Sequence, residues 1–133
     1  MKRYFIISLI VLSAFACKKE KFSPEGPTDV RIRNKSASVF NEVTVSISDS
    51  TKVFGTIDPG NVSGYIRFHK AYPKAKITAK IRVGGSMVTF STGEVDYTYM
   101  QYIGQDKITY EVDINNNELK ITDVIHDEPL VLK

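Results

Sequence analysis

The chain has 133 residues, of which 42% are hydrophobic and 25% charged, and this length and composition favour one globular domain over two. Lysine and arginine number 18 and aspartate and glutamate 15, but two of the cations, Lys2 and Arg3, belong to the extreme N-terminus. The rest of the chain is close to neutral, which argues against a protein that binds nucleic acid through its overall charge.

Residues 1–16 have the pattern of a secretory signal peptide. Lys2 and Arg3 come first, an uncharged run covers residues 5–16, and small residues close it. That run is well short of the about 20 apolar residues with which a helix crosses a bilayer. We therefore expect residues 1–16 to be removed on export, and not to form a membrane span or a helix of the mature fold.

Cys17 is the only cysteine, and it directly follows this segment. The sequence SAFAC at 13–17 resembles the lipobox of bacterial lipoproteins, which implies that Cys17 carries diacylglycerol on its sulfur and an N-acyl chain. A lone thiol in an exported protein has no disulfide partner, which favours lipid attachment. The alternative is an ordinary A-x-A site, where signal peptidase I cuts after Ala16 and leaves a soluble periplasmic protein. Beyond the covalent lipid we expect no cofactor.

The start of the mature chain, CKKEKF, is similar to that of small outer-membrane lipoproteins from Bacteroidota-type bacteria. The resemblance implies a membrane anchor, and Lys18 in place of an aspartate implies sorting to the outer membrane. The sequence leaves undecided whether the protein faces the periplasm or the cell surface. Residues 17–28 are polar, with two prolines and a glycine, and we expect a lipidated flexible tether there.

From residue 29 onward the dominant hydrophobic period is two. Apolar and polar residues alternate at 30–33, 43–47, 75–83 and 107–114, as they do in half-buried antiparallel strands. Turn-forming residues separate these segments: Asp-Pro-Gly-Asn at 58–61, Gly-Gly at 84–85 and three asparagines at 115–117. We therefore predict an all-β fold in which residues 29–133 form a single antiparallel β-sandwich of about 7–9 strands.

Three consecutive segments, VRIRNKS, FNEVTVSISD and FGTIDPGNVSGYIRF, resemble immunoglobulin-like domains of bacterial surface proteins. The resemblance implies an immunoglobulin-like sandwich that binds or spaces other molecules and does not catalyse. Because unrelated functions share this fold, the fold alone does not fix the function.

We find no constellation that predicts an enzyme or a metal site. His69 and His126, the only histidines, are expected on the surface. The stretch 113–117 begins like a calcium loop but lacks its glycine and its final glutamate, so an asparagine-rich hairpin turn is the better interpretation. Glu94 and Asp96 have the spacing of a carboxylate pair on one strand face, and we interpret them as solvated and not as a glycosidase pair.

Charge is divided unevenly along the chain. Residues 17–87 hold 13 cations and 6 anions, whereas residues 88–133 hold 3 cations and 9 anions. The domain is therefore either a strong dipole or a fold in which the halves neutralise each other. Four cations share the outward phase of one predicted strand, and we call them the basic stripe: Lys74, Lys76, Lys80 and Arg82. The stripe either contacts an anionic partner or protects a sheet edge from strand addition.

The segment VDYTYMQYI at 95–103 is predicted to be a further strand. Its tyrosines are candidates for stacking on sugar or peptide: Tyr97, Tyr99 and Tyr102. The alternative is that these rings cover the core of the sandwich.

Together these patterns predict a non-enzymatic outer-membrane lipoprotein that acts as a binding or accessory module. Besides the membrane, its expected partner is a protein complex of the cell envelope, which the basic stripe would contact. The alternative is a glycan, which the tyrosines would contact.

Overall fold

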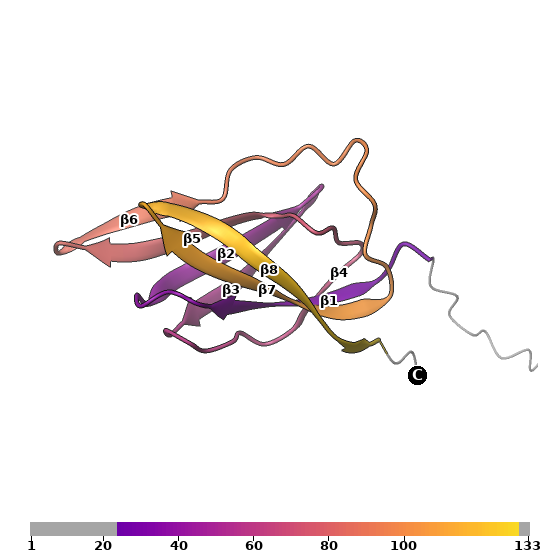
Figure 1. Cartoon of the computed structure of the whole chain (residues 1–133), viewed down its shortest axis with the longest axis horizontal. Coiled ribbons are helices and arrows are strands. Elements are labelled where there is room, and N and C mark those ends of the chain that lie inside the picture. The colour runs from indigo at the N-terminus through magenta and orange to yellow at the C-terminus, as the bar shows by residue number, and fades with distance from the viewer. Residues whose placement is uncertain (1–23, 131–133) are drawn as a thin grey trace, which may run out of the picture.

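The computed structural model describes residues 24–130, so the predicted signal peptide and Cys17 lie outside the described residues. This part of the chain is all-β and forms eight strands (Figure 1): β1 Thr28–Asn34, β2 Phe40–Ile47, β3 Ser50–Ile57, β4 Ile66–Phe68, β5 Lys76–Val83, β6 Ser86–Ser91, β7 Asp106–Asn115 and β8 Glu118–Pro129. The predicted fold class and the approximate number of strands are confirmed.

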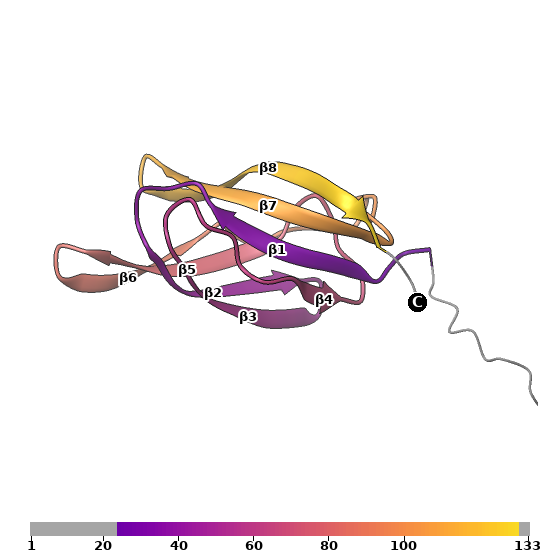
Figure 2. The same cartoon turned by 90° about the horizontal axis from the view of Figure 1, so that it is seen from below.

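The strands form two facing sheets of four, in the orders β4-β1-β7-β8 and β3-β2-β5-β6 (Figure 2). Every ladder is antiparallel, as predicted, except that β1 runs parallel to β7 over seven residue pairs. The immunoglobulin-like variety of sandwich stays a prediction. The described chain enters and leaves at one end of the molecule, and the β5–β6 hairpin extends beyond the rest of the sandwich at the other end (Figure 1).

The core forms because alternate residues of each strand point between the sheets. In β1, Val30 and Ile32 are fully buried while the arginines between and after them are half-buried on the outer face. Tyr110 of β7 is the largest fully buried side chain, and its hydroxyl donates to the carbonyl of Tyr72. Burial raises the pKa of this hydroxyl far above its ordinary value, so it stays protonated.

The predicted turns lie where the sequence places them. Gly84 and Gly85 join β5 to β6 with φ of +57° and +85°, and Asn116 and Asn117 join β7 to β8 with φ of +52° and +62°. Two-residue hairpin turns with both φ positive match the twist of the strands, and glycine and asparagine tolerate this geometry. The stretch 113–117 is therefore a hairpin turn, as interpreted from its asparagines.

The last residues of the segment predicted to be a tether, residues 17–28, are part of the folded domain. Gly26 and Pro27 are buried, and β1 already begins at Thr28. The hydroxyl of Thr28 donates to the carbonyl of Gly104 at 2.5 Å. The folded domain thus includes Gly26 and Pro27.

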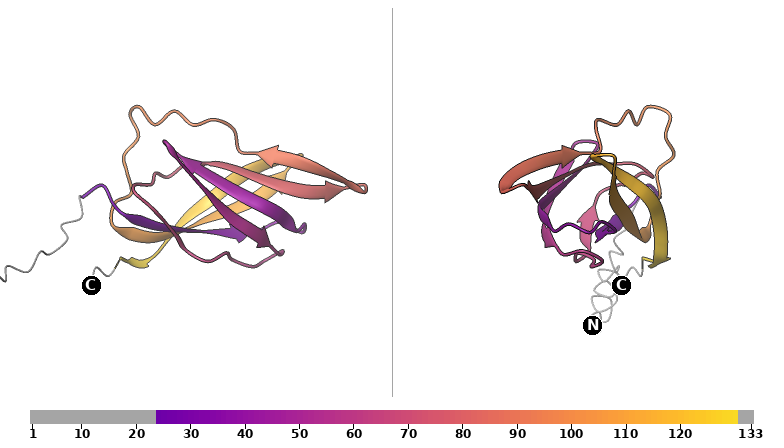
Figure 3. Two further views of the ribbon diagram at one scale, coloured as in Figure 1. Left: turned by 180° about the vertical axis from the view of Figure 1, so that it is seen from behind. Right: turned by 60° about the vertical axis from the view of Figure 1, so that its left-hand side comes forward.

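The prediction of a strand at 95–103 is wrong. Residues 92–105 form an irregular connection that arches away from the sandwich between β6 and β7 (Figure 3). Gly93 and Gly104 near its ends have φ of +94° and +96°, which strands do not adopt. The alternation in this segment therefore does not reflect sheet pairing. Single contacts and no ladder tie it to the rest of the fold, such as the bond from Ile103 N to the carbonyl of Ala71 at 2.8 Å.

We predict that Gly26→Ala destabilises the protein, because a Cβ at residue 26 would lie 2.1 Å from the carbonyl oxygen of His69. Overpacking against backbone costs about 1–3 kcal/mol. Gly64→Ala is the matched control, since a Cβ at residue 64 meets nothing within 4 Å. Urea unfolding of both variants measures the difference, and equal stabilities would contradict the tight packing described at Gly26.

Candidate functional site

The basic stripe lies inside a sheet and not at its edge. β5 is bonded on one side to β2 and on the other to β6, so the interpretation of its lysines as guards of an edge is wrong. Lys76 forms an ion pair with Glu94, and Lys80 forms one with Glu42 at 2.9 Å. Two of the four cations are therefore partly neutralised. Lys74 precedes the strand and is exposed, as is Arg82 at its far end.

The structure does not bring the three candidate tyrosines onto one surface. Tyr97 packs its ring on Tyr72 with centroids 4.6 Å apart, and burial raises the pKa of its hydroxyl. Tyr99, by contrast, is 99% exposed, and Tyr102 is half-buried. One ring thus covers the core, as the alternative held, and one is fully available to a ligand.

A groove of about 490 Å³ opens beside the 92–105 connection, between the start of β5 and the start of β8. It is lined by ten residues: Lys74, Ala75, Thr92, Glu94, Val95, Asp96, Met100, Leu119, Lys120 and Ile121. Its volume lies within the range of about 300–1,000 Å³ that is typical of ligand sites. Of the predicted site residues it includes only Lys74. The β8 residues carry no local signal of a site, because only the packing of the two sheets brings them to the groove.

The groove combines apolar walls with charges of both signs. Apolar side chains come from all three segments, while Lys74 and Lys120 oppose Glu94 and Asp96 in charge. None of the lining residues is aromatic. The site therefore suits a ligand with both apolar and charged groups better than a sugar ring that needs an aromatic platform.

Thr92 fixes the start of the connection against β5. Its hydroxyl accepts from Ile77 N at 2.8 Å and donates to the carbonyl of Ala75 at 3.0 Å, while its own N–H donates to the carbonyl of Ile77. Farther along, the Asp96 carboxylate accepts from the hydroxyl and the N–H of Thr98, and these bonds lower its pKa. The carboxylate on this side of the groove is therefore ionised at neutral pH.

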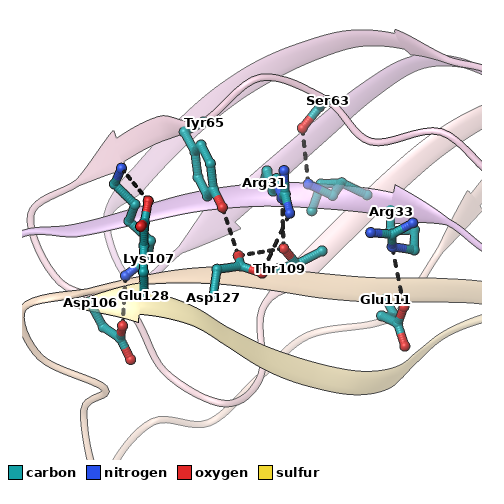
Figure 4. Close-up of polar contacts among 11 residues, drawn as sticks. Arg31, Arg33, Ser63, Tyr65, Asp106, Lys107, Thr109, Glu111, Asp127 and Glu128 are labelled. Atoms are coloured by element: carbon teal, nitrogen blue, oxygen red, sulfur yellow. Dashed lines mark hydrogen bonds and ion pairs between the residues drawn. The ribbon is translucent and has the colours of Figure 1, made fainter. Parts of the chain in front are cut away.

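A second polar cluster lies on the outer face of the β4-β1-β7-β8 sheet (Figure 4). Asp127 is at its centre: it accepts from the hydroxyls of Thr109 and Tyr65 at 2.6 and 2.8 Å and pairs with Arg31 at 3.4 Å. Arg31 also donates through Nε to Thr109 at 2.8 Å and lies 4.8 Å from the centroid of the Tyr65 ring. The cluster joins β1, β7, β8 and the segment before β4.

The cluster uses its hydrogen-bonding groups internally, which points to a structural role. Burial alone would raise the pKa of Asp127, but the hydrogen bonds from Thr109 and Tyr65 and the charge of Arg31 outweigh it and lower the pKa. The pKa of the Tyr65 hydroxyl is raised by burial and by its bond to Asp127. Ion pairs flank the cluster on both sides, Arg33 with Glu111 and Lys107 with Glu128.

The two histidines lie apart in the fold. His126 of β8 pairs with Asp106, whereas His69 follows β4 and is exposed, as predicted. Among residues 24–130, no group of three His, Cys, Asp or Glu side chains is arranged to hold a metal ion. Within the same residues no helix has the length and apolar character to span a membrane.

No protein-family model matches the chain, and no curated protein matches it. Among solved structures, an NMR structure of a protein from Eubacterium rectale is similar, with 14% sequence identity and a TM-score of 0.49. The similarity covers 77% of this chain and 89% of that one.

We predict that Asp127→Ala lowers the free energy of unfolding at pH 7 by about 1–3 kcal/mol, because it leaves two hydroxyls and the Nη2 of Arg31 without their acceptor. Since the pKa of Asp127 is lowered in the folded state, its contribution is complete above the unfolded value of about 3.9 and disappears as the pH falls through the folded value. The difference from wild type should therefore shrink below about pH 4.

The control for this prediction is Glu128→Ala, the next residue, which removes an exposed ion pair with Lys107. Such pairs contribute about 0–1 kcal/mol. Urea unfolding between pH 2 and pH 7 measures both variants. A loss at Asp127 that is no larger than the loss at Glu128, or that does not change with pH, would contradict the role given to the cluster.

Proposed function

We propose that the chain is a lipid-anchored, non-enzymatic lipoprotein of the outer membrane that acts as a binding or accessory module for another envelope protein. The groove between β8 and the 92–105 connection supports this most directly. It is the place where a candidate cation, Lys74, other charges of both signs and an apolar surface come together.

A polypeptide segment is the ligand that best matches this groove. Pockets that take the side chains of a bound peptide give such a site its specificity. The groove offers apolar walls such as Val95 and Met100, and charges of both signs. A protein segment carries all the complementary groups.

A glycan is the second candidate, and one observation favours it. Tyr99 presents an aromatic ring that is 99% exposed, on the arching connection. Tyr97 packs against Tyr72, however, so a second ring is not available beside it. A sugar would contact Tyr99 outside the groove.

The lipid anchor is proposed from the part of the sequence that precedes the folded domain. Cys17 stands nine residues before Gly26, the first buried residue in the part of the chain that the structure describes. Several acyl chains at about 0.8 kcal/mol per buried methylene hold a protein stably, whereas one chain is marginal. The lipid on Cys17 would hold the domain near the membrane and leave the groove accessible.

We predict that Cys17→Ser moves the protein from the membrane fraction to the soluble periplasmic fraction, because serine offers no thiol for the thioether. Lys18→Ala is the control and should stay in the membrane. Mass spectrometry of the wild-type N-terminal peptide checks the chemistry directly. An unacylated N-terminal Cys17 would contradict the anchor and support cleavage by signal peptidase I.

We further predict that a photo-crosslinking residue at Val95, in the groove, captures one protein of defined mass in intact cells. The matched control is Val53, which is 63% exposed on β3 and lies outside the groove. Lys74→Glu should lower the adduct yield severalfold, because it reverses a charge that lines the groove, whereas Lys52→Glu on β3 should not.

Equal adducts from the two positions, or an adduct unaffected by Lys74→Glu, would contradict the groove as the binding site. A saccharide adduct obtained only from a crosslinker at Tyr99 would favour the glycan candidate. Gel electrophoresis and mass spectrometry distinguish a protein adduct from a glycan adduct.

A further inference from the structure

Four strands form the edges of the two sheets, and three of them carry features that oppose pairing with another chain. β4 has only three residues and includes Arg67. β8 carries charges along its whole length and ends at Pro129. β3 carries Lys52 and has an irregular register where it pairs with β2, next to Gly55. Short strands, charges and bulges are the usual protections of a sheet edge.

β6 has none of these protections. Its sequence, SMVTFS, lacks charge, proline and glycine, and among the described residues no strand pairs with its outer side. Met87 and Val88 are 45% and 40% exposed. The hairpin that contains β6 projects past the opposite sheet, so its inner face is uncovered near the tip (Figures 2 and 3).

We propose that β6 pairs with β6 of a second copy of this chain, antiparallel and about a two-fold axis at Thr89. The pairing would join the two β3-β2-β5-β6 sheets into one continuous sheet. This inference is independent of the groove and of its ligand.

The backbone of β6 determines which residues form the new bonds. The two-residue turn at 84–85 makes Val83 and Ser86 a hydrogen-bonded pair, and pairs alternate from there along the β5–β6 ladder. Arg82 with Met87, and Lys80 with Thr89, are therefore non-hydrogen-bonded pairs. It follows that Met87, Thr89 and Ser91 direct their N–H and C=O groups to the outer edge.

Only one register uses all three of these residues. With the axis at Thr89, this residue lies opposite its own copy, and Met87 lies opposite Ser91 of the second copy. Moving the axis to Val88 or Phe90 leaves one of the three without a partner in β6. Centring at Thr89 also places Val88 opposite Phe90 of the second copy, on the face that β5 continues with Ile81 and Ala79. The new seam is thus apolar on its inner face.

The charges of the hairpin permit this self-pairing. β6 carries none, so no like charges face each other across the seam. The nearest cation on the same row, Lys80, lies three strand spacings from its own copy, about 14 Å, which exceeds the Debye length of about 8–10 Å. Lys80 is also paired with Glu42. Since β3 protects the far edge of each sheet, assembly closes at two copies and does not continue into a fibre.

Cysteine crosslinking in the full-length chain tests the register. In a Cys17→Ser background, which removes the only native thiol, Thr89→Cys should form a disulfide-linked dimer, because opposed residues have Cα atoms about 5.5 Å apart. Thr56→Cys on β3, an exposed threonine at the other edge of the same sheet, is the control and should stay monomeric. Met87→Cys and Ser91→Cys should crosslink when mixed but not alone, since each lies about 13 Å from its own copy.

Sedimentation measurements give a second, independent readout. Thr89→Glu places a carboxylate beside Lys80 within one copy but sets two carboxylates together at the axis, so the dissociation constant of the dimer should rise at least tenfold. Thr56→Glu should leave it unchanged. The proposal is overturned if Thr89→Cys crosslinks no better than Thr56→Cys, or if the wild-type protein sediments as a monomer at the concentrations at which crosslinking is tested.

Discussion

The parallel pairing of β1 with β7 is the contact on which the rest of the fold depends. It joins Thr28–Asn34 to Asp106–Val112 over seven residue pairs, near the two ends of the described chain. Without it, the β4-β1-β7-β8 sheet would be two separate strand pairs, and neither covers the opposite sheet. At the end of β1 the buried Asn34 amide donates to the carbonyls of Ser38 and Ile57, which ties this strand to the sheet that faces it.

The same pairing resolves the uneven distribution of charge along the sequence. β1 comes from the basic half of the chain, whereas β7 and β8 come from the acidic half. Arg31 therefore meets Asp127, and Arg33 meets Glu111, across neighbouring strands. The halves partly neutralise each other on this face, which is the second of the two arrangements that the sequence allows. Opposite charges in adjacent strands also favour this strand order over one that groups the cations.

The sequence predicts the inward and outward phases of β1, β2, β5 and β7 because each of these strands has one face in the core, and local alternation records that burial. It does not predict which strands are neighbours. The place of β5 between β2 and β6, and the parallel contact of β1, depend on residues far apart in the chain. Alternation also misleads at 95–103, where Tyr97 turns inward to meet Tyr72 without any strand.

The residues of the groove also differ in whether the sequence could predict them. Lys74 could be found from sequence, because exposed cations on one phase stand out in a short segment. Leu119 and Ile121 could not, since they look like ordinary core residues of a strand and reach the groove only because β8 lies at the margin of the sandwich.

The described chain enters and leaves at one end of an elongated domain, with the β5–β6 hairpin at the other end (Figure 1). If the chain is lipid-anchored as proposed, the hairpin of a single copy would lie at the end of the domain opposite to the anchor. Antiparallel pairing of β6 would reverse the second copy end for end, so the two anchors would lie at opposite ends of the pair. Such a pair would lie flat on one membrane or would bridge two facing membranes.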